Sequence, residues 1–107
     1  MSVRLKISVK VQDRLLREDG PIQGARVALW WIQEPSGEPF FRRERITDSQ
    51  GLAVFLVPPG KYLAQVNAQE YTAVIEDAIG NEASDLVIDT AMGTDQFPVF
   101  ANMTRDE

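Results

Sequence analysis

The chain has 107 residues, of which 16 are acidic and 11 are basic, giving a net charge of −5, and it contains no cysteine and no histidine. Its length fits one domain that can bury its own hydrophobic core. The composition excludes disulfides, thiolate metal sites and histidine-based triads or zinc sites, and the negative charge disfavours nucleic acid as a partner.

The N-terminal segment lacks the apolar core of a signal peptide. No apolar run approaches the roughly 20 residues of a membrane helix. We therefore expect a soluble chain with no membrane insertion. It is expected to be cytoplasmic or exported by a non-classical route, such as a contractile secretion system.

Charge is spread unevenly along the chain. Residues 1–61 hold ten Lys or Arg against seven Asp or Glu, whereas residues 62–107 hold one against nine. Strands from both halves of a sequence are expected to interleave in a β-sandwich. The asymmetry need not therefore polarise the surface.

Seven short strands are predicted along the chain. Residues 3–11 alternate apolar and polar side chains, the period of a strand with one buried face. The apolar run 52–57 has the length of a strand, and alternation returns over residues 61–68. The predicted strands are 3–11, 25–33, 40–47, 52–57, 61–68, 71–76 and 85–91. With turn signals every ~8–12 residues, this pattern predicts an all-β fold, an antiparallel Greek-key β-sandwich of seven or eight strands.

Glycine and proline mark the turns between these strands. Asp48 to Gly51 has the pattern of a type I turn. The run Pro58-Pro59-Gly60 cannot continue a strand and must reverse the chain. Gly24 and Gly51 stand where strands begin after tight bends, which favours a positive φ.

The last 16 residues are expected to lie outside the main domain, with the sandwich at residues 1–91 and a C-terminal extension at residues 92–107. The run Phe97-Pro98-Val99-Phe100 is too apolar to remain in water. Pro98 suits an edge strand, where its missing N–H is harmless. The extension is therefore predicted to be either an edge strand or a docking segment for a partner.

The pair Trp30-Trp31 predicts an exposed aromatic face, because neighbours in a strand point to opposite sides. We take Trp30 as the outward residue, since residues 27, 29 and 31 continue one face. A hairpin around residues 34–39 would bring Trp30 near Arg43 in a cation–π contact, and Ile32 near Phe41. Protein-binding hot spots favour Trp and Arg, and the alternatives are a covered tryptophan or a sugar-stacking platform. The predicted contact residues are Trp30, Phe41, Arg43, Arg45, Phe97 and Phe100.

The run from Gly20 to Leu29 resembles the opening of carboxypeptidase regulatory-like domains, which belong to the transthyretin-like group. The pattern continues at Thr47, Asp48, Gly51, Ala53, Phe55, Pro59, Gly60, Tyr62, Val66 and Tyr71. Glu70 stands where the family usually has Gly. The resemblance covers about residues 3–91 and implies a seven-stranded sandwich, used mostly as a non-catalytic attachment or interaction unit. Phe55 and Tyr62 are expected on adjacent antiparallel strands, where they can meet across the core.

Related transthyretin-like enzymes need residues that this chain lacks. Hydroxyisourate hydrolases use His and a C-terminal Tyr-Arg-Gly-Ser, and intradiol dioxygenases use His ligands. The Glu that assists isopeptide bonds in Cna B-type domains is replaced here by Val66. The carboxylates between residues 76 and 89 are read as a solvated acidic loop or as a calcium site. We expect no enzymatic activity, no cofactor and no metal site.

The sequence thus predicts a non-catalytic protein-interaction or structural module of a larger assembly. A secretion spike or phage-tail-like component of bacterial or phage origin is one such setting. The alternative is a glycan-binding or adhesin-type surface module.

Overall fold

The computed structural model describes residues 5–16, 20–33, 38–90 and 96–106, and these residues form nine strands and no helix. The fold is therefore all-β, as predicted, and no helix long and apolar enough to cross a membrane occurs in the described chain. The strands are β1 Leu5–Asp13, β2 Arg26–Gln33, β3 Glu38–Ile46, β4 Leu52–Val57, β5 Lys61–Asn67, β6 Tyr71–Asp77, β7 Glu82–Ala83, β8 Leu86–Asp89 and β9 Gln96–Arg105.

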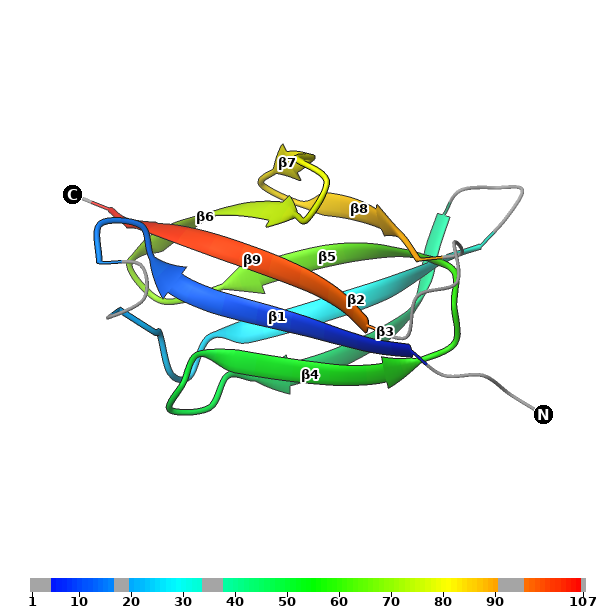
Figure 1. Ribbon diagram of the computed structural model, residues 1–107, viewed down its shortest axis with the longest axis horizontal. Helices are drawn as coiled ribbons and strands as arrows, with labels where there is room; N and C mark the ends of the chain where they lie inside the picture. Colours follow the sequence, from blue (N-terminus) through cyan, green and yellow to red (C-terminus); the bar gives the residue numbers. More distant parts are fainter. Residues whose placement is uncertain (1–4, 17–19, 34–37, 91–95, 107) are drawn as a thin grey trace.

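The strands form two sheets that face each other as a β-sandwich (Figure 1). One sheet has the order β4-β1-β9-β6-β7 and the other the order β3-β2-β5-β8. The strand pairs are antiparallel, except that β1 and β9 run parallel. All seven predicted strands are present, although residues 3, 4 and 91 lie outside the described residues. The expected total of seven or eight strands was too low: β9 is the strand that the extension was expected to supply, but the two-residue strand β7 was not predicted.

The two halves of the sequence occupy opposite sides of the sandwich. In each sheet the strands from β1 to β4 are neighbours, and the strands from β5 to β9 fill the remainder. Figure 1 shows β1 and β4 along one side and β6, β7 and β8 along the other. The expected interleaving was therefore wrong. In the described strands, β1 to β4 hold more basic than acidic residues and β5 to β9 hold more acidic than basic ones, so this part of the chain has a basic side and an acidic side.

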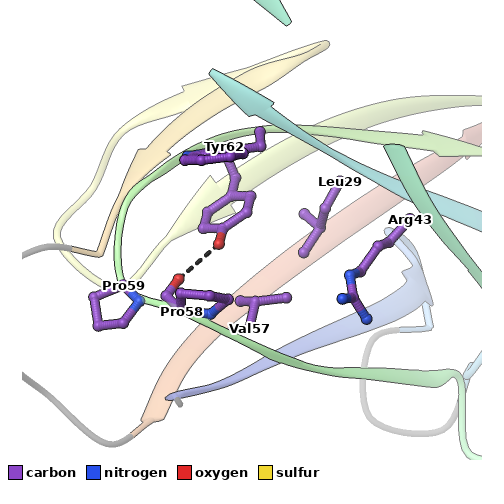
Figure 2. Close-up of a pocket in the computed structure, with 7 residues that line it drawn as sticks. Leu29, Arg43, Val57, Pro58, Pro59 and Tyr62 are labelled. Atoms are coloured by element: carbon purple, nitrogen blue, oxygen red, sulfur yellow. Dashed lines mark hydrogen bonds between the residues drawn. The ribbon is translucent and has the colours of Figure 1, made fainter. Parts of the chain in front are cut away.

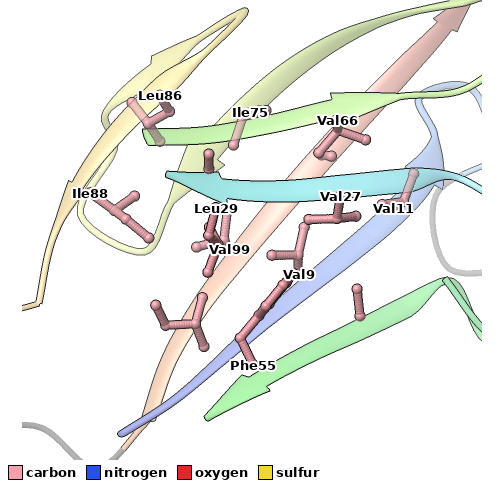
Figure 3. Close-up of a cluster of buried hydrophobic side chains, with 14 of the residues drawn as sticks. Val9, Val11, Val27, Leu29, Phe55, Val66, Ile75, Leu86, Ile88 and Val99 are labelled. Carbon is pink, nitrogen blue, oxygen red and sulfur yellow. The ribbon is translucent and has the colours of Figure 1, made fainter. Parts of the chain in front are cut away.

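Alternate residues of the facing strands fill the space between the two sheets (Figure 3). Ile7, Val9 and Val11 of β1 are completely buried, which confirms the period of two read from the sequence. Val27 and Leu29 of β2 close the core from the other sheet. Both sheets thus present one apolar face inward and leave the other to solvent.

Phe55 and Tyr62 both belong to this core, but their strands are not neighbours in one sheet. β4 lies in the five-stranded sheet and β5 in the four-stranded sheet. The expectation of adjacent antiparallel strands was therefore wrong. The Pro58-Pro59-Gly60 connection carries the chain from one sheet to the other, so the two rings approach the core from opposite layers.

The predicted C-terminal extension contains a central strand. β9 lies between β1 and β6 in the five-stranded sheet, so the expectation of an edge strand was wrong. Val99, Ala101 and Met103 of β9 are completely buried. At Pro98 itself, β9 has a neighbouring strand on one side only. Pro98 is paired with Ser8 of β1, whereas β6 pairs with β9 only from Val99 onward, so the missing N–H of the proline is tolerated.

Four of the described residues, Gly24, Gly51, Glu70 and Gly80, have a positive φ and lie in turns. Gly24 and Gly51 have φ angles of 84° and 74°, as predicted. Glu70, which stands where the resembled family has Gly, has a φ of 69° and is the non-glycine residue with positive φ among the described residues. The backbone N–H of Tyr71 donates to the carbonyl of Ala68 across this turn at 3.1 Å.

Candidate functional site

A pocket of about 320 Å³ opens where β4 passes into β5 (Figure 2). Leu29 and Trp31 of β2 and Arg43 of β3 line it from one sheet. Tyr62 of β5 and the β4–β5 connection complete it. The full lining is Leu29, Trp31, Arg43, Val57, Pro58, Pro59 and Tyr62. We call this the end pocket. It is almost entirely apolar, with one cation among the described side chains that line it.

Tyr62 and Pro58 hold the shape of the end pocket. The Tyr62 hydroxyl donates a hydrogen bond to the carbonyl oxygen of Pro58 at 2.6 Å (Figure 2). Tyr62 is buried, and this burial raises the pKa of its hydroxyl, while the nearby charge of Arg43 lowers it to a lesser extent. The phenol therefore stays neutral and keeps the proton that it donates. The contact spans four residues and fixes the connection against β5.

Trp31 is the exposed tryptophan of the pair. Its side chain is 44% exposed, whereas Trp30 is half-buried. Trp31 follows Val27 and Leu29 on the face that points toward the other sheet, as the sequence predicted. The facing strand β4 ends at Val57, so Trp31 reaches the pocket and not the closed core. Trp30 does face away from the core, as predicted, but Trp31 is the more exposed of the two tryptophans.

Arg43 supplies the positive charge of the end pocket. It lies opposite Leu29 in the β2–β3 ladder and is exposed on β3, an edge strand of its sheet. An arginine beside apolar and aromatic walls can bind a carboxylate while the walls take up an apolar group. The pocket is therefore suited to a group that is both apolar and acidic.

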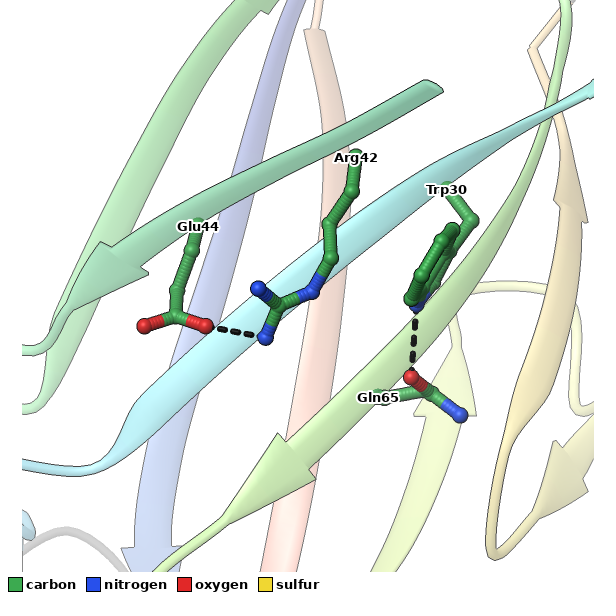
Figure 4. A network of polar contacts seen from close by, with 4 residues as sticks. All are labelled: Trp30, Arg42, Glu44 and Gln65. Carbon is green, nitrogen blue, oxygen red and sulfur yellow. Dashed lines mark hydrogen bonds and ion pairs between the residues drawn. The ribbon is translucent and has the colours of Figure 1, made fainter. Parts of the chain in front are cut away.

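Trp30 lies on the other side of this sheet, facing away from the core (Figure 4). Its indole N–H donates to Oε1 of Gln65 at 2.7 Å, and the guanidinium of Arg42 lies 5.5 Å from its ring centroid. Arg42 also forms an ion pair with Glu44. A cation–π contact was predicted for Trp30, but its partner is Arg42 and not Arg43.

The wrong partner follows from a slip of one residue in the predicted register. Trp30 pairs with Arg42 and Trp31 with Phe41, and a bulge then brings Ile32 opposite Pro39. A slip of one residue moves a side chain to the opposite face of a sheet. Trp30 and Arg43 therefore lie on opposite faces, and the predicted Trp30/Arg43 patch does not exist.

The remaining predicted contact residues are dispersed. Arg45 is exposed on β3 opposite Val27, and Phe41 lies in β3 opposite Trp31. Phe97 is half-buried and packs against the core. Phe100 is 37% exposed on the outer face of the five-stranded sheet. The five predicted residues whose side chains the structure describes thus belong to at least three separate surfaces and form no single site.

The end pocket itself was not predicted. Its residues come from β2, β3 and the β4–β5 connection, and their proximity depends on how the two sheets face each other. The sequence did mark Pro58-Pro59-Gly60 and Tyr62, but as a turn and a strand. The signal available beforehand was the unusual proline pair next to a tyrosine.

The acidic residues near β6 point in different directions. Asp77 is buried, and Asn81 donates to both of its carboxylate oxygens at 3.0 Å. Glu76 points to the outer face and accepts a hydrogen bond from Asn102 at 2.8 Å. In the described residues no group of three or more acidic side chains is placed to hold a metal ion.

No family model matches this chain, and no curated protein matches it. A solved structure, "The Bacillus anthracis TIE protein", is similar over 96% of this chain with a TM-score of 0.66 and 15% sequence identity. This chain spans only 17% of that protein chain. At this identity the likeness concerns the fold alone: the same arrangement forms a small part of a much longer protein.

Proposed function

We propose that this sandwich is a non-catalytic protein-interaction module of a larger assembly, and that it binds its partner through the end pocket. The pocket carries the proposal, because it combines an exposed tryptophan, a tyrosine and an arginine, the residue types enriched in binding hot spots. A structural neighbour in which the fold makes up 17% of the chain is consistent with a module that serves a larger protein or complex.

The chemistry of the pocket suggests what the partner presents. A volume of about 320 Å³ is at the small end of ligand sites and accommodates one or two side chains. The apolar walls of Leu29, Val57 and Pro59 suit an aliphatic or aromatic side chain, and Arg43 suits a neighbouring carboxylate. We therefore propose a partner segment that carries an apolar anchor next to Asp, Glu or a C-terminal carboxylate.

We assign the sandwich to the Greek-key, transthyretin-like type. The bond from the Tyr62 hydroxyl to a carbonyl four residues upstream has the form of the tyrosine corner of Greek-key sandwiches. The positive φ of Gly24 and Gly51 supports the resemblance to carboxypeptidase regulatory-like domains, which carry Gly at these positions. A spike of a secretion or phage-tail-like system is one setting that this resemblance suggests.

The alternative of a glycan-binding module has less support from the site. Sugar rings stack on open aromatic faces, but Arg42 lies over the ring of Trp30 and Gln65 holds its N–H. Trp31 is more exposed, yet the described side chains around it are mainly apolar and offer few hydrogen-bonding groups for sugar hydroxyls. A screen against a sugar array tests this alternative directly.

The test compares two tryptophans on opposite faces of one strand. The tagged protein is incubated with lysate of its own host, and bound proteins are identified by mass spectrometry for the wild type, Trp31→Ala and Trp30→Ala. We expect a stoichiometric partner that Trp31→Ala loses and Trp30→Ala retains, with both variants folded by circular dichroism. A partner retained by Trp31→Ala, or sugar binding without a protein partner, would contradict the proposal.

A further inference from the structure

The outer face of the five-stranded sheet carries a row of five side chains, one from each strand. The registers place Leu52, Lys10, Phe100, Glu76 and Glu82 next to one another across the sheet. These positions alternate with the buried residues of their strands, so their side chains lie on the solvent side. We call them the central row. In this row an aromatic ring has a cation on one side and two carboxylates on the other.

Apolar side chains surround the central row. Val54 and Val74 are each 38% exposed and Leu56 is 56% exposed, all on this face. A groove of about 450 Å³ lies beside the Phe100 ring, with Ser8 and Pro98 in its lining. An apolar patch of this kind on a sheet face marks an interaction surface. The ring protrudes next to a hollow on the same face, so the face offers both a projection and a recess.

We propose that this face binds a second copy of the same chain in a two-fold symmetric, face-to-face dimer, an interaction separate from the end pocket. In the central row a cation lies on one side of Phe100 and carboxylates on the other, so the row is complementary in charge to a second copy of itself in the reverse order. A two-fold axis that lies between the copies and runs along β9 exchanges the two sides of the row. Phe100 then faces Phe100, and Lys10 of each copy faces Glu76 of the other.

The other charges of this sheet support the same arrangement. Both lysines of β1, Lys6 and Lys10, lie on one side of β9, and Glu76 of β6 and Glu82 of β7 lie on the other, so the basic part of each copy covers the acidic part of the second. An axis that crosses the strands would instead place Lys10 against Lys10, which like-charge repulsion disfavours. Of these two axes, only the one along β9 places Lys10 opposite Glu76, and such a self-complementary patch is what a two-fold interface requires.

The size of the face sets the expected strength. Five strands of 2 to 10 residues, spaced by about 4.8 Å with about 3.3 Å per residue, give roughly 550 Å² per copy. Stable interfaces typically bury about 800 Å² per partner, so this one is at the low end. We expect dimers in the micromolar range of protein concentration, weakened by salt because dissolved ions screen the attraction between Lys10 of one copy and Glu76 of the other.

A charge-swap series measured by sedimentation equilibrium tests the proposal. Lys10→Glu places carboxylates opposite each other, and Glu76→Lys places ammonium groups opposite each other, so each is expected to weaken dimerisation at least about tenfold. The double variant Lys10→Glu with Glu76→Lys reverses both charges and should regain most of the affinity. This recovery distinguishes a contact between copies from a general loss of stability.

Two further variants separate this face from the rest of the surface. Phe100→Glu removes the central ring and should abolish the dimer. Val87→Glu introduces the same charge on the outer face of the other sheet, where Val87 is 50% exposed, and should leave the dimer intact. A carbodiimide, which joins an amine to a carboxylate, should link Lys10 of one copy to Glu76 of the other in mixtures of isotope-labelled and unlabelled protein.

Several results would overturn the proposal. A wild type that remains monomeric up to millimolar protein concentration excludes a second copy as the occupant, whatever else binds this face. A dimer that Phe100→Glu and the single charge reversals leave unchanged uses another surface. If Phe100→Glu fails to fold, the charge-swap series still decides, since all three of its variants keep the apolar residues.

Discussion

The carbonyl oxygen of Glu70 accepts a hydrogen bond of 2.8 Å from the backbone N–H of Asp106, joining the turn before β6 to the end of β9. Glu70 accepts this bond in a left-handed conformation, with a φ of 69°. An L-residue other than Gly pays about 1–2 kcal/mol in this conformation. The turn is therefore held in place by its surroundings against the preference of its own side chain.

Replacing Glu70 with Gly is expected to stabilise the protein. Gly removes the steric cost of the positive φ but loses more entropy on folding, so we expect a net gain of about 0.5–1 kcal/mol. Urea unfolding measures the change. Glu70→Ala is the matched control, since it removes the same charge and keeps the strain. An equal gain in both variants would show that charge and not φ is responsible.

Gly51→Ala is expected to destabilise strongly. A Cβ at this position would lie 2.4 Å from the carbonyl oxygen of Val11, and the φ of 74° is unfavourable for Ala. Because backbone cannot move aside easily, we expect a loss of about 2–4 kcal/mol. Gly24→Ala is the control, because its φ is 84° but no atom lies within 4 Å of the added Cβ. It should cost only about 1 kcal/mol. Equal losses in the two variants would rule out the clash with Val11.

Tyr62→Phe removes the hydroxyl that holds Pro58. One hydrogen bond of this kind contributes about 1 kcal/mol to stability, and we expect a loss of that size in thermal and urea unfolding. Tyr71→Phe provides the comparison, because the Tyr71 hydroxyl lies 3.4 Å from both Asp13 and Arg105, too far for a strong bond. If the two variants lose equal stability, the Tyr62–Pro58 contact does not have the role assigned to it.

Stability is expected to fall in acid. Burial alone would raise the pKa of Asp77, but hydrogen bonds from Asn81, Ile79 and Gly80 together lower its pKa below the ordinary value of 3.8. Backbone N–H groups of Leu52 and Gln50 likewise lower the pKa of Asp48. A carboxyl whose pKa is depressed by folding stabilises the native state above its unfolded pKa, near pH 4, and loses that contribution as pH falls through the native pKa.

The variant Asp77→Asn tests this pH dependence. It should be less stable than the wild type at pH 7 by about 1–2 kcal/mol, because Asn accepts fewer hydrogen bonds than a carboxylate. Its stability should also change less between pH 4 and pH 2. Urea midpoints measured across this range give both quantities. A variant with the same acid slope as the wild type would show that Asp77 does not contribute to it.

Local patterns predicted most strands, whereas contacts between distant segments were missed. The alternation in β1 and the turn glycines Gly24 and Gly51 are set by nearest neighbours, and both were confirmed. The register of β2 on β3 was wrong by one residue, because the bulge after Trp31 changes the pairing and leaves no clear signal in the sequence. Because the true register differs by one residue from the predicted one, Arg43 lies in the end pocket and not beside Trp30.

The place of β9 illustrates the same limit. The run Phe97–Phe100 was recognised as too apolar for water, but Pro98 suggested an edge. The proline is tolerated because β6 begins to pair one residue later, and this depends on strand order that no local rule provides. The end pocket was missed for a related reason, since three segments meet there only after the sheets have packed.

The parallel pairing of β1 and β9 also determines how the domain would respond to mechanical force. Leu5 begins β1 and Arg105 ends β9, and in a parallel pair these two points lie at opposite ends of the sandwich. Tension applied between them pulls the two strands along each other, so their ladder of hydrogen bonds, from Lys6 to Asp13, resists in shear and must break together. A sandwich built in this way is expected to resist a pulling load along β1 and β9 without unzipping strand by strand.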